Sequence, residues 1–110
     1  MKARLWVVIP TYNEAANVEP ILRAVTDELQ RIGVRDYRVL VVDDNSPDGT
    51  GQIADRLAQE LDTVEVLHRG TKTGLGHAYL AGFAVALAGG AELVVEMLRR
   101  HPEIWGMLAP

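Results

Sequence analysis

The chain of 110 residues contains no cysteine, which excludes disulfides, thiolate nucleophiles and thiolate zinc sites and fits a reducing compartment. It also lacks long apolar runs, because no segment approaches the ~20 apolar residues that a bilayer span requires. Positive charge is in deficit. The net charge of −4 argues against a broad nucleic-acid surface, although a local phosphate site built from backbone N–H groups stays open.

Apolar runs and three- to four-residue apolar spacing alternate along the chain, which predicts strands and helices in turn. The expected strands are Leu5–Ile9, Tyr37–Val42, Val64–Leu67 and Leu93–Met97, and the expected helices are Glu14–Ile32, Thr50–Leu61 and Leu75–Leu87. The length allows one domain or a piece of one. This alternation predicts an α/β protein with an open, mostly parallel sheet of βαβ units.

Polar or glycine-rich sequence follows each of the first three expected strands. Asp43 and Asp44 come directly after the second strand. One interpretation is that they are turn or helix-capping residues, which these residue types favour. However, the carboxyl ends of parallel strands lie along one edge, where open α/β sheets bind ligands. The convergence of three such loops there favours a binding site.

The residue types in these loops suit a nucleotide. Tyr12 offers an aromatic face for a base, with packing over the first helix as the alternative. Asp44 can accept hydrogen bonds from a base N–H or a ribose hydroxyl. Lys72, Arg69 and the amides of the glycine-rich loop at residues 70–76 can meet phosphates.

Other familiar motifs are excluded. The loop at residues 70–76 lacks the Gly-Lys-Ser/Thr ending of a P-loop. Tyr79 stands where a dinucleotide fingerprint needs its third glycine. His68 and His77 have no acidic partner at metal-ligand spacing, so we expect no zinc site.

Three strings together resemble a family 2 glycosyltransferase of the GT-A fold, and specifically its polyprenol (dolichol) phosphate mannosyltransferase branch. They are Val-Ile-Pro-Thr-Tyr-Asn-Glu at 8–14, Val-Val-Asp-Asp-Asn-Ser-Pro-Asp-Gly-Thr at 41–50 and Lys-Thr-Gly-Leu-Gly-His-Ala-Tyr-Leu-Ala-Gly-Phe at 72–83. The resemblance covers roughly residues 5–97, in family order and spacing.

The resemblance implies that residues 1–97 are the Rossmann-like, nucleotide-sugar-binding half of a GT-A domain. It implies a hexosyltransferase with GDP-mannose as donor, a polyprenyl phosphate as acceptor and inversion at the sugar, located in the cytoplasm with peripheral contact at the cytoplasmic face of a membrane left open. Another donor such as UDP-glucose, or an inactive nucleotide-binding module, is the alternative. The implied nucleotide-binding residues are Pro10, Tyr12, Glu14, Asp43, Asp44, Lys72 and Gly74. Among them, Asp44 would contact the base; no catalytic residue is assigned.

The chain departs from the family after the fourth expected strand. In the family, the strand matching Leu93–Met97 runs into an Asp-x-Asp motif that holds a divalent cation, Mg or Mn. Here Leu-Arg-Arg follows, and no aspartate occurs after Asp62. We therefore expect a divalent cation for the family but not its ligands in this chain. Residues 98–110 stay unassigned; a truncated or frameshifted product, an engineered fragment and a junction across missing residues are the open explanations.

Overall fold

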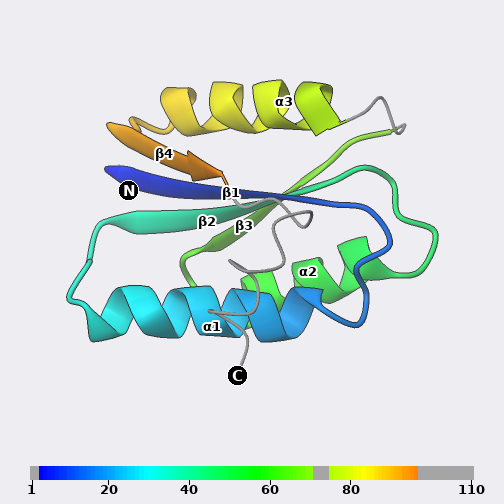
Figure 1. The fold of residues 1–110 in the computed structure, drawn as a ribbon, viewed down its shortest axis with the longest axis horizontal. Helices are drawn as coiled ribbons and strands as arrows, with labels where there is room; N and C mark the ends of the chain where they lie inside the picture. The colour runs from blue at the N-terminus through cyan, green and yellow to red at the C-terminus, as the bar shows by residue number, and fades with distance from the viewer. Residues whose placement is uncertain (1–2, 71–74, 97–110) are drawn as a thin grey trace.

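The computed structural model describes residues 3–70 and 75–96, in which strands and helices alternate along the chain (Figure 1). The strands are β1 (Leu5–Thr11), β2 (Tyr37–Asp43), β3 (Val64–His68) and β4 (Leu93–Glu96), and the helices are α1 (Val18–Arg31), α2 (Thr50–Glu60) and α3 (Leu75–Ala88). All strand pairs are parallel, in the order β3-β2-β1-β4. The predicted α/β class with an open parallel sheet is confirmed.

Helices cover both faces of the sheet, with α1 and α2 on one face and α3 on the other (Figure 1). Alternate residues of β1 serve the two faces: Val7 and Ile9 pack toward α1 and α2, whereas Trp6 and Val8 pack toward α3. A strand covered on both sides needs apolar side chains at every position. This explains the continuous apolar runs in the two central strands, β1 and β2. The outer strands β3 and β4 have exposed positions, such as Glu65 and Leu93.

Helix α3 approaches the sheet closely at Gly82. A Cβ added at this glycine would lie 2.6 Å from Cγ1 of Val8 and 3.2 Å from Cγ2 of Val42. Only a residue without a side chain fits there. The outer face of the helix is also apolar, because Leu80 and Leu87 are each 66% exposed.

Strand β1 extends two residues beyond its predicted end at Ile9, so that end was predicted wrongly, and Pro10 lies within the strand. The carbonyl of Thr11 accepts the N–H of Asp44, which directs the backbone groups of Thr11 toward β2. Alternate residues of a strand direct these groups to opposite sides, so Pro10 is directed toward β4. There the described pairing already ends, at Val8 with Glu96. The missing N–H of proline therefore removes no hydrogen bond from the described sheet.

Helix α1 begins at Val18, four residues after the predicted start. A turn precedes it, in which the carbonyl of Glu14 accepts the N–H groups of Asn17 and Val18. Pro20 suits the first helical turn because the N–H that proline lacks would have no partner there. The fourth strand ends at Glu96 within the described residues, and the predicted Met97 lies outside them.

The connection from β3 to β4 crosses to the other side of β1, so the strand order reverses between β1 and β4. In open α/β sheets, ligands bind beyond the carboxyl ends of the strands at such a reversal. The loops after β1, β2 and β3 therefore form the described part of the predicted binding edge. Across residues 3–70 and 75–96, the structure has no helix long and apolar enough to cross a membrane.

Candidate functional site

The carboxyl ends of β1, β2 and β3 are level with one another. Thr11 pairs with Asp43, and Asp43 pairs with His68. Two backbone hydrogen bonds continue the ladder past the strand ends, from the Asp44 N–H to the Thr11 carbonyl and from the Arg69 N–H to the Asp43 carbonyl, at 3.1 and 2.8 Å. The three loops therefore leave the sheet side by side, as the sequence predicts.

Asp43 is 2% exposed, and its carboxylate binds the loop around it. Oδ1 accepts the hydroxyls of Thr11 at 2.8 Å and Ser46 at 2.6 Å. Oδ2 accepts the Ser46 N–H at 3.0 Å. Three donors compensate the burial of the charge. Asp43 thus joins the end of β1 to the loop after β2, a role that the sequence reasoning did not assign to it.

Asp44 is 5% exposed and forms an ion pair with Arg69, whose Nη1 lies 2.8 Å from Oδ1 of Asp44. Both side chains are largely buried, so water screens the pair little. In the described part of the chain we find a donor for Oδ1 and none for Oδ2. Arg69, which we expected near phosphates, engages Asp44 instead.

The loop after β1 holds three of the predicted residues in different surroundings. Pro10 and Glu14 are buried, whereas Tyr12 is 38% exposed. Glu14 accepts a hydrogen bond from the side chain of Asn17 at 3.1 Å. Asn13 has φ of 57°, a left-handed conformation that asparagine tolerates, and it turns the chain sharply after Tyr12. The exposed aromatic side chain thus precedes a fixed turn at the rim.

Five of the seven predicted nucleotide-binding residues lie at the carboxyl ends of β1 and β2 or in the loops that follow these strands. Lys72 and Gly74 fall outside the described residues. Asn45 anchors the start of their loop, since its Nδ2 donates to the carbonyl of Gly70 at 3.1 Å. The sequence reasoning assigned no roles to Thr11 and Ser46, although hydroxyl side chains around a buried aspartate are a usable signal of such a network.

No group of three or more His, Asp or Glu side chains close enough to hold a metal occurs in residues 3–70 and 75–96. His68 and Asp55 form a pair, with Nε2 of His68 2.7 Å from Oδ1 of Asp55. Asp43 and Asp44 are each occupied by protein donors. These carboxylates therefore do not fit a divalent-cation site.

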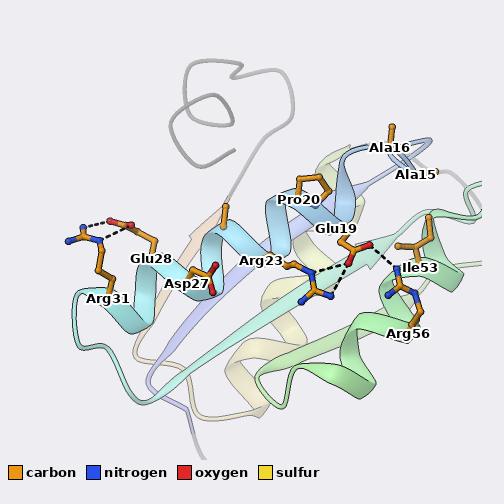
Figure 2. A pocket seen from close by; sticks show the side chains of 11 residues that line it. Ala15, Ala16, Glu19, Pro20, Arg23, Asp27, Glu28, Arg31, Ile53 and Arg56 are labelled. Carbon is orange, nitrogen blue, oxygen red and sulfur yellow. Dashed lines mark hydrogen bonds and ion pairs between the residues drawn. The ribbon is translucent and has the colours of Figure 1, made fainter. Parts of the chain in front are cut away.

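A groove runs along α1 beside α2, from the loop after β1 toward the carboxyl end of α1. Its lining residues include Glu19, Arg23, Asp27 and Arg56 (Figure 2). Glu19 binds both Arg23 and Arg56 at 2.9 Å, and Glu60 binds the same two arginines at 2.7 and 3.0 Å. The arginine hydrogen bonds lower the pKa of both glutamates. These four side chains form a closed ring of ion pairs that links α1 to α2. Their charges are therefore paired with one another.

Comparison with known proteins places these features in a family. The sequence profile described as glycosyl transferase family 2 matches residues 6–88. The polyprenol monophosphomannose synthase of Mycolicibacterium smegmatis is 48% identical over 95 residues, covering 86% of this chain and 34% of that protein. The undecaprenyl-phosphate mannosyltransferase of Micrococcus luteus is 49% identical over 94 residues, covering 86% and 37%.

More distant proteins match the same region. The dolichol-phosphate mannosyltransferase of Pyrococcus furiosus is 36% identical over 96 residues, covering 87% of this chain and 26% of that protein. A solved mannosyltransferase from Pyrobaculum calidifontis, in complex with GDP-Man and Mn2+, superimposes with a TM-score of 0.68 and 27% identity, covering 78% of this chain and 25% of that one. The chain thus spans about a third of the first two curated relatives.

Proposed function

Since the chain belongs to glycosyltransferase family 2, we propose that it forms the donor-binding part of a mannosyltransferase, transferring mannose from GDP-mannose to a polyprenyl phosphate with inversion. One relative is named as a polyprenol monophosphomannose synthase, and two are named as mannosyltransferases for undecaprenyl phosphate or dolichol phosphate. A solved mannosyltransferase holds GDP-Man. The observation that carries the proposal is the half-engaged Asp44 carboxylate at the rim, on the loop next to Tyr12.

Asp44 is the base-recognising residue in this proposal. Guanine presents adjacent N–H donors that a carboxylate can accept together, whereas the pairing edge of uracil presents a single N–H. Arg69 uses one lone pair of Oδ1 of Asp44, so the second lone pair of Oδ1 together with Oδ2 can accept the two guanine N–H groups side by side. This geometry favours GDP over UDP, which is why we prefer GDP-mannose to UDP-glucose as the donor.

Tyr12 supplies the stacking surface for the base, because it is the partly exposed aromatic residue at this edge. Stacking of a base on an aromatic ring is worth about 1–3 kcal/mol by alanine substitution in nucleic-acid complexes. Pro10 and Glu14 support the loop from buried positions. Lys72 and Gly74 stay predicted contacts for the diphosphate. The lipid acceptor implies that transfer takes place at a membrane surface.

The transfer itself asks little of a general base, because the attacking oxygen of a phosphate acceptor is already anionic. The acceptor must be held in line with the departing diphosphate, and the charge on that diphosphate must be neutralised. A divalent cation supplies this neutralisation where it is bound. The described carboxylates do not fit such an ion, so we assign this chain donor binding and assign no catalytic residue.

A second candidate function is a nucleotide-binding module without activity of its own. The observation that favours it is the engagement of both Asp43 and Asp44 by protein donors, which leaves the described edge without a cation site. The module would hold GDP by the same loops and gain nothing from a metal.

Isothermal titration calorimetry of the 110-residue chain separates these ideas. We expect GDP and GDP-mannose to bind, UDP to bind at least tenfold more weakly, and Tyr12→Ala to weaken GDP by about tenfold or more. Tyr12→Phe is the matched control and keeps the ring. Binding that ignores Mn2+ supports the inactive module, and tightening by Mn2+ supports the transferase. Equal affinity for GDP and UDP would overturn the guanine assignment, and no binding would remove both candidates.

A further inference from the structure

The string Ser-Pro-Asp-Gly-Thr after β2 binds the backbone of the loop after β1. Three successive N–H groups of that loop each reach one side chain of the string. The donors Asn13, Glu14 and Ala15 pair in order with Ser46 Oγ, Thr50 Oγ1 and Asp48 Oδ2, at 3.0, 2.9 and 3.1 Å. Among the described residues, no other segment accepts hydrogen bonds from three consecutive backbone N–H groups of a different loop through its side chains.

Two of these contacts are relays that end on a carboxylate. The Ser46 hydroxyl accepts the Asn13 N–H and donates to Oδ1 of Asp43. The Thr50 hydroxyl accepts the Glu14 N–H and donates to Oδ1 of Asp48. A hydroxyl that donates to an anion becomes a stronger acceptor, because neighbouring hydrogen bonds polarise one another. Both relays thus hold the loop more firmly than isolated hydroxyl contacts would.

The turn within the string fixes the three acceptors. Gly49 has φ of 92°, which a residue with a side chain adopts only with strain. Asp48 also accepts the N–H of Thr50, at 3.1 Å. These hydrogen bonds, with the Thr50 hydroxyl as the largest cause, lower the pKa of Asp48. Asp48 and Thr50 therefore form one rigid unit at the start of α2.

The contacts have a chemical consequence for the ligand. Successive N–H groups in a loop can cradle a phosphate when they point to solvent. Here those of residues 13–15 are all consumed by the string. These three amides are therefore not offered to the diphosphate, and the hydrogen bonds fix the backbone that follows Tyr12.

We propose that Ser46, Asp48 and Thr50 are positioning residues that hold residues 12–15 in the conformation that binds the nucleotide. This inference rests on the proposed function for its ligand but not for its geometry. The three side chains act through the loop and make no contact with the nucleotide themselves.

The test pairs amide hydrogen exchange with GDP titration on the 110-residue chain. Thr50→Val removes the hydroxyl while keeping the shape, and Thr50→Ser restores it. Thr63→Val is the matched control, because the Thr63 side chain makes no hydrogen bond among the described residues. We expect Thr50→Val to raise exchange at the Glu14 amide about tenfold, with strand amides unchanged, since one hydrogen bond contributes on the order of a tenfold equilibrium shift.

The same Thr50→Val variant should weaken GDP binding about three- to tenfold, with Thr50→Ser and Thr63→Val close to the parent. Ser46→Ala provides a second variant, read at the Asn13 amide, if Thr50→Val does not fold. Unchanged exchange at these amides would overturn the proposal that Ser46, Asp48 and Thr50 hold the loop. Faster exchange with unchanged GDP affinity would overturn its role in binding. A parent chain that shows protected amides and no GDP binding would instead count against the proposed function alone.

Discussion

Nη1 of Arg69 lies 2.8 Å from Oδ1 of Asp44 across the ends of two neighbouring strands, and both side chains are largely buried. The pair links the loop after β3 to the loop after β2. It also satisfies a carboxylate that would otherwise be costly to bury. One contact therefore serves stability and orients the carboxylate that we assign to base recognition.

Arg69→Ala should lower the free energy of unfolding by roughly 3 kcal/mol, because it leaves Asp44 buried without its cation. The double variant Arg69→Ala with Asp44→Ala removes the uncompensated charge and should recover a substantial part of that loss. Urea denaturation of Arg69→Ala, Asp44→Ala and the double variant completes a double-mutant cycle. Additive losses would contradict a coupled pair.

Asp43→Asn should destabilise the protein by about 2–3 kcal/mol, since an amide cannot accept all three donors that bind the carboxylate. In the asparagine, an NH2 donor would replace one carboxylate oxygen. It would then face a hydroxyl or an N–H that donates to that oxygen in the parent. Asp36→Asn is the control and should change little, because Asp36 is exposed and directly precedes β2 at its other end. Chemical denaturation compares them, and equal stabilities would show that the Asp43 network contributes nothing.

Gly82→Ala should destabilise the protein by about 1–3 kcal/mol, although alanine is the better helix former. The new Cβ would meet Val8 at 2.6 Å in a packed interface. Combining Gly82→Ala with Val8→Ala removes the obstructing methyls, so the double variant should lose less than the sum of the single losses. Thermal unfolding monitored by circular dichroism measures all three. A Gly82→Ala variant as stable as the parent would mean that α3 shifts freely on the sheet.

Stability should fall in acid partly through Asp48. The Thr50 hydroxyl and backbone N–H donors lower the pKa of Asp48 in the folded state. A lowered folded pKa means that the stabilisation is present above the unfolded value of about 4 and is lost as pH falls through the folded pKa. Asp48→Asn should therefore be less stable than the parent at neutral pH, and the difference should shrink in acid. Parallel denaturation curves in neutral and acidic buffer give this comparison, and a pH-independent difference would contradict it.

The sequence predicts the sheet well, because apolar runs that alternate with helical apolar spacing leave few alternatives to parallel strands joined by helices. It fails at Pro10, where the outcome depends on which side of β1 is still unpaired, a property of the strand order. It also fails at Glu14: the apolar spacing begins only at Val18, where α1 starts, and residues 14–17 form a turn that this spacing does not indicate. In the site, the strand-end rule locates Asp43 and Asp44 correctly. Their different roles depend on Thr11, Ser46 and Arg69, whose proximity only the folded register creates.

The strand order also determines when each side of β1 can pair during synthesis of the chain. Strand β1 is made before β4, with which it pairs on one side, and Leu5 and its partner Leu93 are separated by 88 positions in the chain. At a ribosomal rate of about 5–20 residues per second, that edge of β1 waits roughly 4–18 seconds for its neighbour. During this interval it is a template for pairing with other nascent chains. Pro10 is directed to that same edge and has no N–H to donate. The proline therefore disfavours pairing of this edge with other chains until β4 has been made.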